Sequence, residues 1–407
     1  MDGDGKGPEP GAGRGSALEV FRVFLLLGLT SFGGPVAHLG YFHDAFVVRR
    51  GWLTDRTYAD LVALCQFLPG PASSQVGMAI GLHRAGYLGM AAAWVGFTLP
   101  SAVLMIGFAY GVGALGAGVG AGWLLGLKAA AVAVVAHAVL GMATSLATGR
   151  RRATIAVAAM VVVLLLPTAG SQVVAIVLGG LVGLFLLARV DDSDDTAETS
   201  SLRVPGRRVA VASLAVFAVL LFGLPTATAL VSSPTLTLVD VFYRAGALVF
   251  GGGHVVLPLL QADLVGAGLV DQETFLAGYG AAQAVPGPLF TFAAYLGAVM
   301  PTAPTGALGG TVALLAVFTP SALLLVGVLP FWERLRAIPR AQGAVAGASA
   351  VVVGLLAAAL YDPVFLSGVT SPAAMALAAV AFLALAVWRL PAWLVVIAAS
   401  AVGFLVL

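Results

Sequence analysis

Short glycine- and proline-rich motifs occur twice in this chain, in the same order and about 218 residues apart. The first copy contains Phe32-Gly33-Gly34-Pro35, Gln66, Pro69-Gly70-Pro71 and Phe97-Thr98-Leu99-Pro100-Ser101. The second copy contains Phe250-Gly251-Gly252-Gly253, Gln283, Pro286-Gly287-Pro288 and Phe318-Thr319-Pro320-Ser321. Chance does not produce such a repeat, so the chain is a duplicated unit whose two halves share one local structure.

The composition requires a lipid environment. Hydrophobic residues make up 60% of the 407 residues and charged residues only 9%, which leaves too little polar surface to cover a globule in water. Apolar segments at 85–112, 121–144 and 209–231 exceed the ~20 residues that cross a bilayer as a helix. They lack the strict alternation of barrel strands. The predicted fold class is an all-α polytopic membrane protein, with the lipid bilayer as its first partner.

Several function classes are disfavoured by what the chain contains. The net charge of +2 does not indicate a nucleic-acid partner. A single cysteine, Cys65, excludes an internal disulfide and disfavours a cysteine-ligated metal site. No GxxxxGK[ST] motif is present, and no paired carboxylates lie within the spans. We therefore expect no enzyme, no cofactor, no metal and no ATP-driven pump.

Arginine positions predict how the two copies lie in the membrane, because basic residues in short loops stay in the cytoplasm. Arg150-Arg151-Arg152 corresponds to 361–372, which has no Lys or Arg, whereas the uncharged 111–120 corresponds to 331–340, which has three arginines. Basic loops thus match neutral ones, which predicts two inverted repeats and a cytoplasmic N-terminus. The predicted units are a disordered tail at 1–16, a first repeat at 17–188, a cytoplasmic linker at 189–208, a linking transmembrane helix at 209–231 and a second, inverted repeat at 232–407.

The segments around the motifs are too short for comfortable spans. Residues 17–32, 57–68 and 72–83 are of this kind, and Pro69-Gly70-Pro71 joins the last two. Proline removes a backbone donor and glycine allows a sharp turn. We expect re-entrant or broken helices whose turns meet near the bilayer midplane. Two counts remain open: about nine spans plus four hairpins, or about 13 full spans.

The turns are suited to an anion. A helix that begins after Pro71 or Pro288 directs unpaired N–H groups and its positive dipole end at the turn. The alternative is that the small residues only allow close helix packing. The predicted substrate-binding residues are Gly33, Gly34, Pro35, Gln66, Pro69, Gly70, Pro71, Ser73, Ser74, Lys128, Gly251, Gly252, Gly253, Gln283, Pro286, Gly287, Pro288 and Thr291.

Ionisable residues inside apolar segments are the remaining candidates, because they are expensive there and are usually functional. Lys128 lies well inside 121–144 and is either a counter-charge for the anion or a structural lysine. The candidates for ion coupling are Glu19, Arg22, His38, Asp240, Arg244 and His254. Pairing of Arg22 with Glu19 and of Arg244 with Asp240, one turn apart in each helix, is an equally good interpretation.

The doubled motifs resemble those of the chromate ion transporter (CHR) family in its long, two-domain form. The resemblance rests on Phe-Gly-Gly-Pro, Gln-x-x-Pro-Gly-Pro and Phe-x-x-Pro-Ser, with Phe-Gly-Gly-Gly in the second copy, and it covers nearly the whole chain outside the tail and linker. It implies a secondary transporter of the cell inner membrane that exports chromate, driven by the proton gradient or the membrane potential. Transport of sulfate or another tetrahedral oxyanion, and an anion channel, remain alternatives, and a homodimer is the assembly left open.

Overall fold

The computed structural model describes residues 15–115, 122–166, 169–187, 203–250, 253–302 and 304–407, and these contain helices and no strands. The first half comprises α1 (Ala17–Thr30), α2 (Gly34–His43), the π-helix η1 (Asp44–Val48), α3 (Asp55–Phe67), α4 (Ala72–Leu115), α5 (Gly122–Leu146), α6 (Gly149–Leu165) and α7 (Ala169–Leu186).

The linking helix α8 (Arg207–Leu230) precedes the second half. That half comprises α9 (Pro234–Leu248), η2 (Gly253–Val255), α10 (Val256–Leu264), α11 (Gln272–Ala284), η3 (Leu289–Thr291), α12 (Phe292–Val299), α13 (Gly306–Val328), η4 (Leu329–Phe331), α14 (Trp332–Arg336), α15 (Pro339–Ala359), η5 (Leu360–Phe365), α16 (Leu366–Gly368), α17 (Pro372–Ala386) and α18 (Ala392–Val406).

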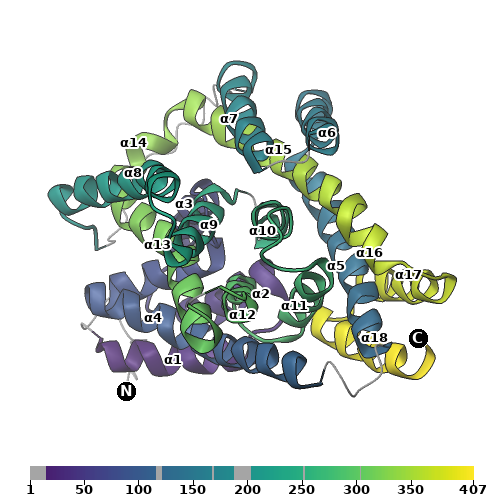
Figure 1. Ribbon diagram of the computed structural model, residues 1–407. Helices are drawn as coiled ribbons and strands as arrows, with labels where there is room; N and C mark the ends of the chain where they lie inside the picture. The colour runs from purple at the N-terminus through teal and green to yellow at the C-terminus, as the bar shows by residue number, and fades with distance from the viewer. Residues whose placement is uncertain (1–14, 116–121, 167–168, 188–202, 251–252, 303) are drawn as a thin grey trace, which may run out of the picture.

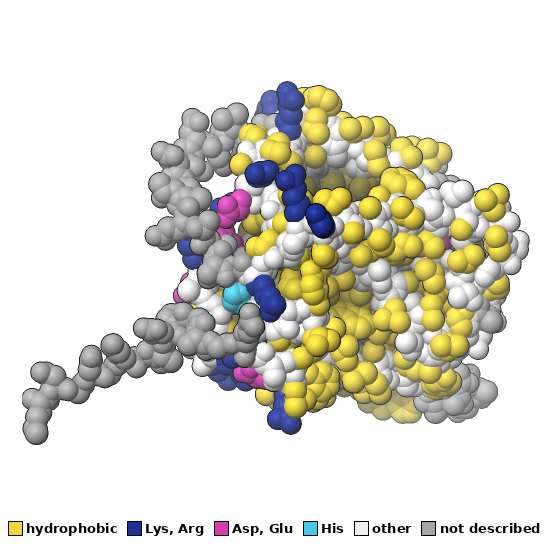
Figure 2. Space-filling view, turned by 90° about the vertical axis from the view of Figure 1, so that its left-hand side faces the viewer, with side chains coloured by type: hydrophobic (Ala, Val, Ile, Leu, Met, Phe, Trp, Pro, Cys, Tyr) yellow, Lys and Arg dark blue, Asp and Glu magenta, His cyan; other side chains and the backbone are white. Residues whose placement is uncertain are grey.

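The helices confirm the predicted fold class, an all-α polytopic membrane protein. Within the described residues, five stretches are long and apolar enough to cross a membrane: Ala72–Gly111, Gly122–Leu146, Arg207–Leu230, Gly306–Arg336 and Pro339–Gly368. Most of the charged side chains visible in Figure 2 lie in a strip along its left side, and much of the remaining face is hydrophobic. Such a broad apolar surface is what lipid contact requires.

The predicted break between 72–83 and 85–112 is confirmed. Ala85 and Gly86 leave helical geometry inside α4, with Gly86 at φ +68°, so that α4 is a short helix followed by a long one. The long part folds back on the short part, where Gly81 packs against the backbone of Gly89. In the second half, Gly297 of α12 packs against Gly309 of α13 in the same way. The same hairpin is thus built twice.

The last two helices of each half pack against a long helix of the other half. α6 and α7 pack on α15 of the second half, whereas α17 and α18 pack on α5 of the first half (Figure 1). Small residues allow the close approach: Gly126 meets Ala399, and Gly347 meets Gly179. The shorter helices α2, α10, α11 and α12 lie in the middle of the view in Figure 1, surrounded by the longer ones.

Candidate functional site

The two Pro-Gly-Pro turns each bond to the opposite half. The N–H of Gly70 donates to the carbonyl of Val249 at 2.7 Å, and the N–H of Gly287 donates to the carbonyl of Ser31 at 2.9 Å. Val249 and Ser31 occupy matching positions at the ends of α9 and α1. The four turns that the sequence predicts to meet therefore do so at the described residues.

Both turn glycines have backbone angles that other residues rarely adopt. Gly70 lies at φ +120° and Gly287 at φ +94°. A side chain at Gly70 would also meet the Oγ of Ser321, and a Cβ at Gly287 would lie 2.8 Å from the Oγ of Ser101. Ser101 and Ser321, each at the end of its Phe-Thr-(Leu)-Pro-Ser motif, thus pack on the Pro-Gly-Pro turn of the other half. Ser101 and Ser321 are absent from the predicted substrate-binding residues, although the repetition of their motif in both halves indicates a shared structural role.

The Gly-rich turns approach each other as well. Gly33 and Gly34 have φ +105° and +81°, and a Cβ at Gly253 would lie 3.5 Å from the ring of Pro35. The predicted site residues Gly251 and Gly252 lie outside the described residues.

Several buried polar atoms on these converging segments have no hydrogen-bond partner. They are the Oγ atoms of Ser31, Ser74 and Ser321, the Oγ1 of Thr98, the Oε1 of Gln75 and the Nε2 of Gln283. Buried polar groups normally have partners, because leaving one unpaired costs about 1–3 kcal/mol. A group of this kind at one place indicates a site for a polar ligand.

The site is electrically neutral in its side chains. Residues 31–35, 69–75, 97–101, 286–291 and 318–321 include no Lys or Arg. Most of the unpartnered atoms are hydroxyls, which can donate to an anion or accept from a donor. The Oε1 of Gln75 is an amide oxygen and can only accept a hydrogen bond. The Nε2 of the same amide already donates to the carbonyl of Pro69 at 2.9 Å.

His38 lies beside this cluster and is 1% exposed. One ring nitrogen lies 3.3 Å from the Oγ of Ser73, and the other lies 3.2 Å from the carbonyl of Ser31, which also accepts from Gly287. His38 thus ties two turns of the first half together. His254, by contrast, contacts the hydroxyl of Tyr279 at 2.8 Å.

Two predicted site residues have other surroundings. Gln66 is exposed at the end of α3, and the buried amide of that region is Gln75 instead. The hydroxyl of Thr291 donates to the carbonyl of Pro288 at 2.8 Å, inside its own turn. Position relative to Pro-Gly-Pro therefore locates the turn but does not identify its ligand-facing side chains.

Lys128 pairs with Glu273, an acidic residue outside the predicted substrate site. Its Nζ lies 2.9 Å from the Oε1 of Glu273, in the first turn of α11. Gln283, beside the Pro-Gly-Pro turn, lies ten residues farther along that helix, which is about 15 Å. The structure therefore places the ammonium of Lys128 toward the start of α11, away from the converging turns.

The two partners of this pair should differ in what their loss costs in stability. The Lys128 side chain is 5% exposed, whereas the Glu273 side chain is 78% exposed. Glu273→Gln leaves an ammonium buried without its carboxylate, and we expect a loss of about 3 kcal/mol of stability. Lys128→Met keeps the apolar stem and leaves Glu273 in solvent, so the loss should stay below about 1 kcal/mol. Thermal unfolding of the purified variants measures both.

The double variant Lys128→Met with Glu273→Gln should recover most of the stability lost by Glu273→Gln alone. Equal losses in the two single variants would contradict this interpretation of the pair. The half-saturation concentration for chromate, measured on Lys128→Met, tests whether the lysine also draws the anion: a steep rise supports a counter-charge.

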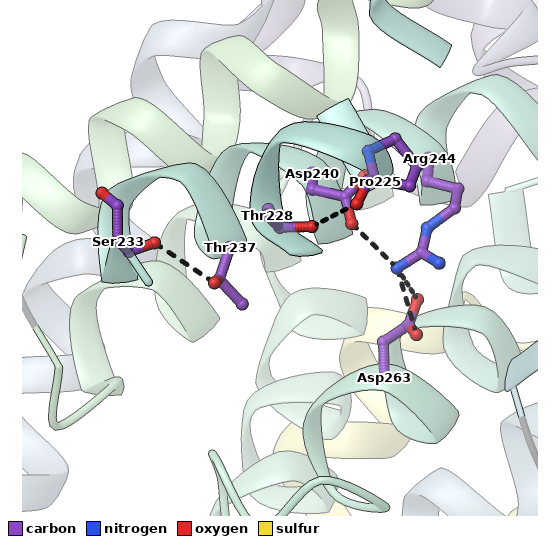
Figure 3. A network of polar contacts seen from close by, with 7 residues as sticks. All are labelled: Pro225, Thr228, Ser233, Thr237, Asp240, Arg244 and Asp263. Atoms are coloured by element: carbon purple, nitrogen blue, oxygen red, sulfur yellow. Dashed lines mark hydrogen bonds and ion pairs between the residues drawn. The ribbon is translucent and has the colours of Figure 1, made fainter. Parts of the chain in front are cut away.

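The coupling candidates form separate ion pairs. Arg244 contacts Asp240, four residues earlier in α9, at 3.3 Å, which confirms intrahelical pairing there. The same pairing is wrong for the first half, where Glu19 contacts Arg84 of α4 at 3.4 Å and Arg22 is exposed. Arg244 also contacts Asp263 of α10 at 3.3 Å, so that one guanidinium lies between two carboxylates (Figure 3).

Comparisons with known proteins agree with the resemblance. The family model described as "Chromate transporter" matches residues 18–184 and again residues 236–404. A chromate transport protein of Pseudomonas aeruginosa is 30% identical over 84% of this chain and 80% of its own length. A probable chromate transport protein of Synechococcus elongatus is 27% identical over 87% and 88%. No solved structure matches the chain.

Proposed function

Because the chain belongs to the chromate transporter family, we propose that it is a secondary transporter that exports chromate across the inner membrane, with its substrate site at the converging turns. The observation that carries the proposal is the group of buried, unpartnered hydroxyls and amides where four turns from two halves meet. Coupling to the proton gradient or the membrane potential, and a cytoplasmic N-terminus, belong to the same proposal.

A tetrahedral dianion suits these groups. Hydroxyls from Ser31, Ser74 and Ser321 can each direct a hydrogen bond to one of its oxygens, and the Nε2 of Gln283 can donate another. Hydrogen bonds to an ionised acceptor are stronger than neutral ones. Since no Lys or Arg lies on these segments, the anion is held without a tight ion pair and can leave again. Sulfate has the same charge and a similar shape and is the alternative substrate.

The crossed hydrogen bonds support movement between two states. Gly70 and Gly287 use their N–H groups to hold the opposite half, so in this conformation those amides are not available to the anion. Rocking of one half against the other would exchange these bonds for contacts to substrate, as expected for alternating access.

Transport by proteoliposomes tests the proposal. Labelled chromate should enter in a saturable way, and unlabelled chromate or sulfate inside the vesicles should accelerate its entry, because a carrier exchanges substrates across the membrane. A channel, which would use the same turns as a filter, would show no such acceleration. Absence of any chromate flux above that of protein-free vesicles would contradict both.

The inverted arrangement makes a prediction of its own. We expect Arg150 and Arg334 to face the cytoplasm and Leu366 to face outside, because basic loops of each copy match neutral loops of the other. Single cysteines at these positions, in a Cys65→Ala background, can be probed with an impermeant thiol reagent. Modification of positions 150 and 366 from the same side would contradict inverted repeats.

A further inference from the structure

The cluster of Asp240, Arg244 and Asp263 contains one more negative than positive charge. Both carboxylates contact the Nη2 of Arg244, at 3.3 Å each, and no further cation among the described residues pairs with either (Figure 3). Two carboxylates and one guanidinium carry a net charge of −1. Asp240 and Asp263 side chains are only 9% and 15% exposed, so this charge lies largely out of water.

A second observation concerns a buried amide on another helix. Gln172 of α7 is 5% exposed, and its Nε2 donates to the carbonyl of Pro258 at 3.2 Å. That bond fixes the orientation of the amide, and it leaves the Oε1 buried without a partner. Gln172, Arg244 and Asp263 line one small cavity of about 10 Å³. A buried acceptor thus shares a cavity with one carboxylate of the charged cluster and with the Nε of Arg244, a buried donor that also has no partner.

We propose that Asp263 is the proton-binding residue of the transport cycle, with Arg244 and Gln172 as the residues that position it. Protonation takes one hydrogen ion from water, converts the carboxylate to a carboxylic acid and brings the cluster to zero net charge. The new O–H can then donate to the Oε1 of Gln172. A cavity of this size holds at most about one water molecule, which favours a proton over a hydrated metal cation.

The surroundings contain little else that titrates. α7, α10 and α13 carry no other ionisable residue, and α15 carries only Arg340. On α8 the charged residues are Arg207 and Arg208 at its start, whereas Pro225 and Thr228, near its end, lie beside Asp240 in Figure 3. Tyr243 of α9 donates to the carbonyl of Phe217, and His254 of η2 bonds to Tyr279. Among the elements packed on α9 and α10, this cluster is therefore the group expected to respond to pH.

The position of the cluster connects it to the converging turns. Arg244 lies five residues, about 7 Å, before Val249 on α9, and Val249 accepts the N–H of Gly70. A change of charge at Arg244 thus acts on the helix whose end holds the first Pro-Gly-Pro turn. This inference rests on the proposed transport function and specifies how that transport couples to protons.

The test uses proteoliposomes with the voltage held at zero and a pH gradient of one unit. For each proton coupled to chromate, the wild type should change its steady-state accumulation ratio about tenfold. Asp263→Asn should keep chromate exchange but hold that ratio near one. Asp60→Asn is the control, since Asp60 pairs with Arg336 at 3.0 Å outside this cluster, and it should behave as the wild type. A tenfold response in Asp263→Asn would overturn the proposal.

A second variant keeps the test valid if Asp263→Asn does not fold. Gln172→Leu leaves all three charges in place and removes the acceptor of the proposed O–H, so the pH of half-maximal stimulation should fall by about one unit. An unchanged pH profile would overturn the role of the cluster. Accumulation that follows a sodium gradient instead would overturn the choice of a proton.

An infrared difference spectrum separates failure of this inference from failure of the proposed function. Lowering the pH should produce one protonated-carboxyl band that is present in the wild type and in Asp60→Asn and missing from Asp263→Asn, beside the bands of exposed carboxyl groups that all three share. This band requires no chromate. Its presence without any chromate flux would contradict the proposed substrate alone, and its persistence in Asp263→Asn would contradict the proton site alone.

Discussion

Gly70→Val and Gly287→Val should each abolish chromate transport. Both positions have positive φ, a conformation that costs a β-branched residue about 1–3 kcal/mol, and both turns lie directly against a buried serine of the other half. The added methyl groups would push Ser321 or Ser101 away and break the crossed hydrogen bonds to Val249 and Ser31. Because the two contacts are equivalent, the two variants should lose transport equally.

Gly268→Val separates lost contacts from backbone strain. Gly268 also has a positive φ, of +69°, but a Cβ there meets nothing within 4 Å. This variant should carry the same kind of strain and still transport chromate at a rate close to the wild type. Flux in proteoliposomes, normalised to folded protein by size-exclusion chromatography, is the measurement. Normal flux in Gly70→Val would show that the turns only help the helices to pack.

Gly126→Leu and Gly347→Leu should each prevent accumulation of folded protein. A Cβ at either position would collide with backbone of a helix from the other half, at Ala399 and Gly179 respectively. A backbone collision cannot be relieved by a change of rotamer, so we expect a loss of about 3 kcal/mol or more. Gly141→Leu, on the same helix as Gly126, meets nothing within 4 Å and should be tolerated.

Expression level and the thermal unfolding midpoint, followed by size-exclusion chromatography, measure these three variants. The expected order is Gly141→Leu close to the wild type, with Gly126→Leu and Gly347→Leu far below it and similar to each other. Full stability of Gly347→Leu would show that the contact between α7 and α15 does not hold the halves together.

Features marked by repeated or local patterns could be predicted from the sequence. The all-helical fold follows from the length of the apolar segments, and the break in α4 from the chemistry of glycine. The packing of each Pro-Gly-Pro turn on the other half follows from the repetition of the motifs. Gln75 was missed because it looks like any polar residue of a helix start, whereas Gln66 was chosen because the second copy repeats it.

Pairs of individual side chains on separate helices could not be predicted. Lys128 with Glu273, and Gln172 beside Asp263, join residues from separate helices whose pairing no local pattern specifies. Glu19 likewise contacts Arg84 rather than its helical neighbour Arg22. In each case the partner depends on how separate helices pack, which the periodicity of the sequence does not contain.

The packing of helices across the two halves also affects how the chain must be made. α5 is synthesised about 250 residues before α17 and α18, the helices that cover its glycine face. During that interval the glycine face of α5 is not yet covered by its partner helices. Other helices in the bilayer can bind to this face before α17 and α18 are made. The glycine face of α5 is therefore covered only when the end of the second half has been made.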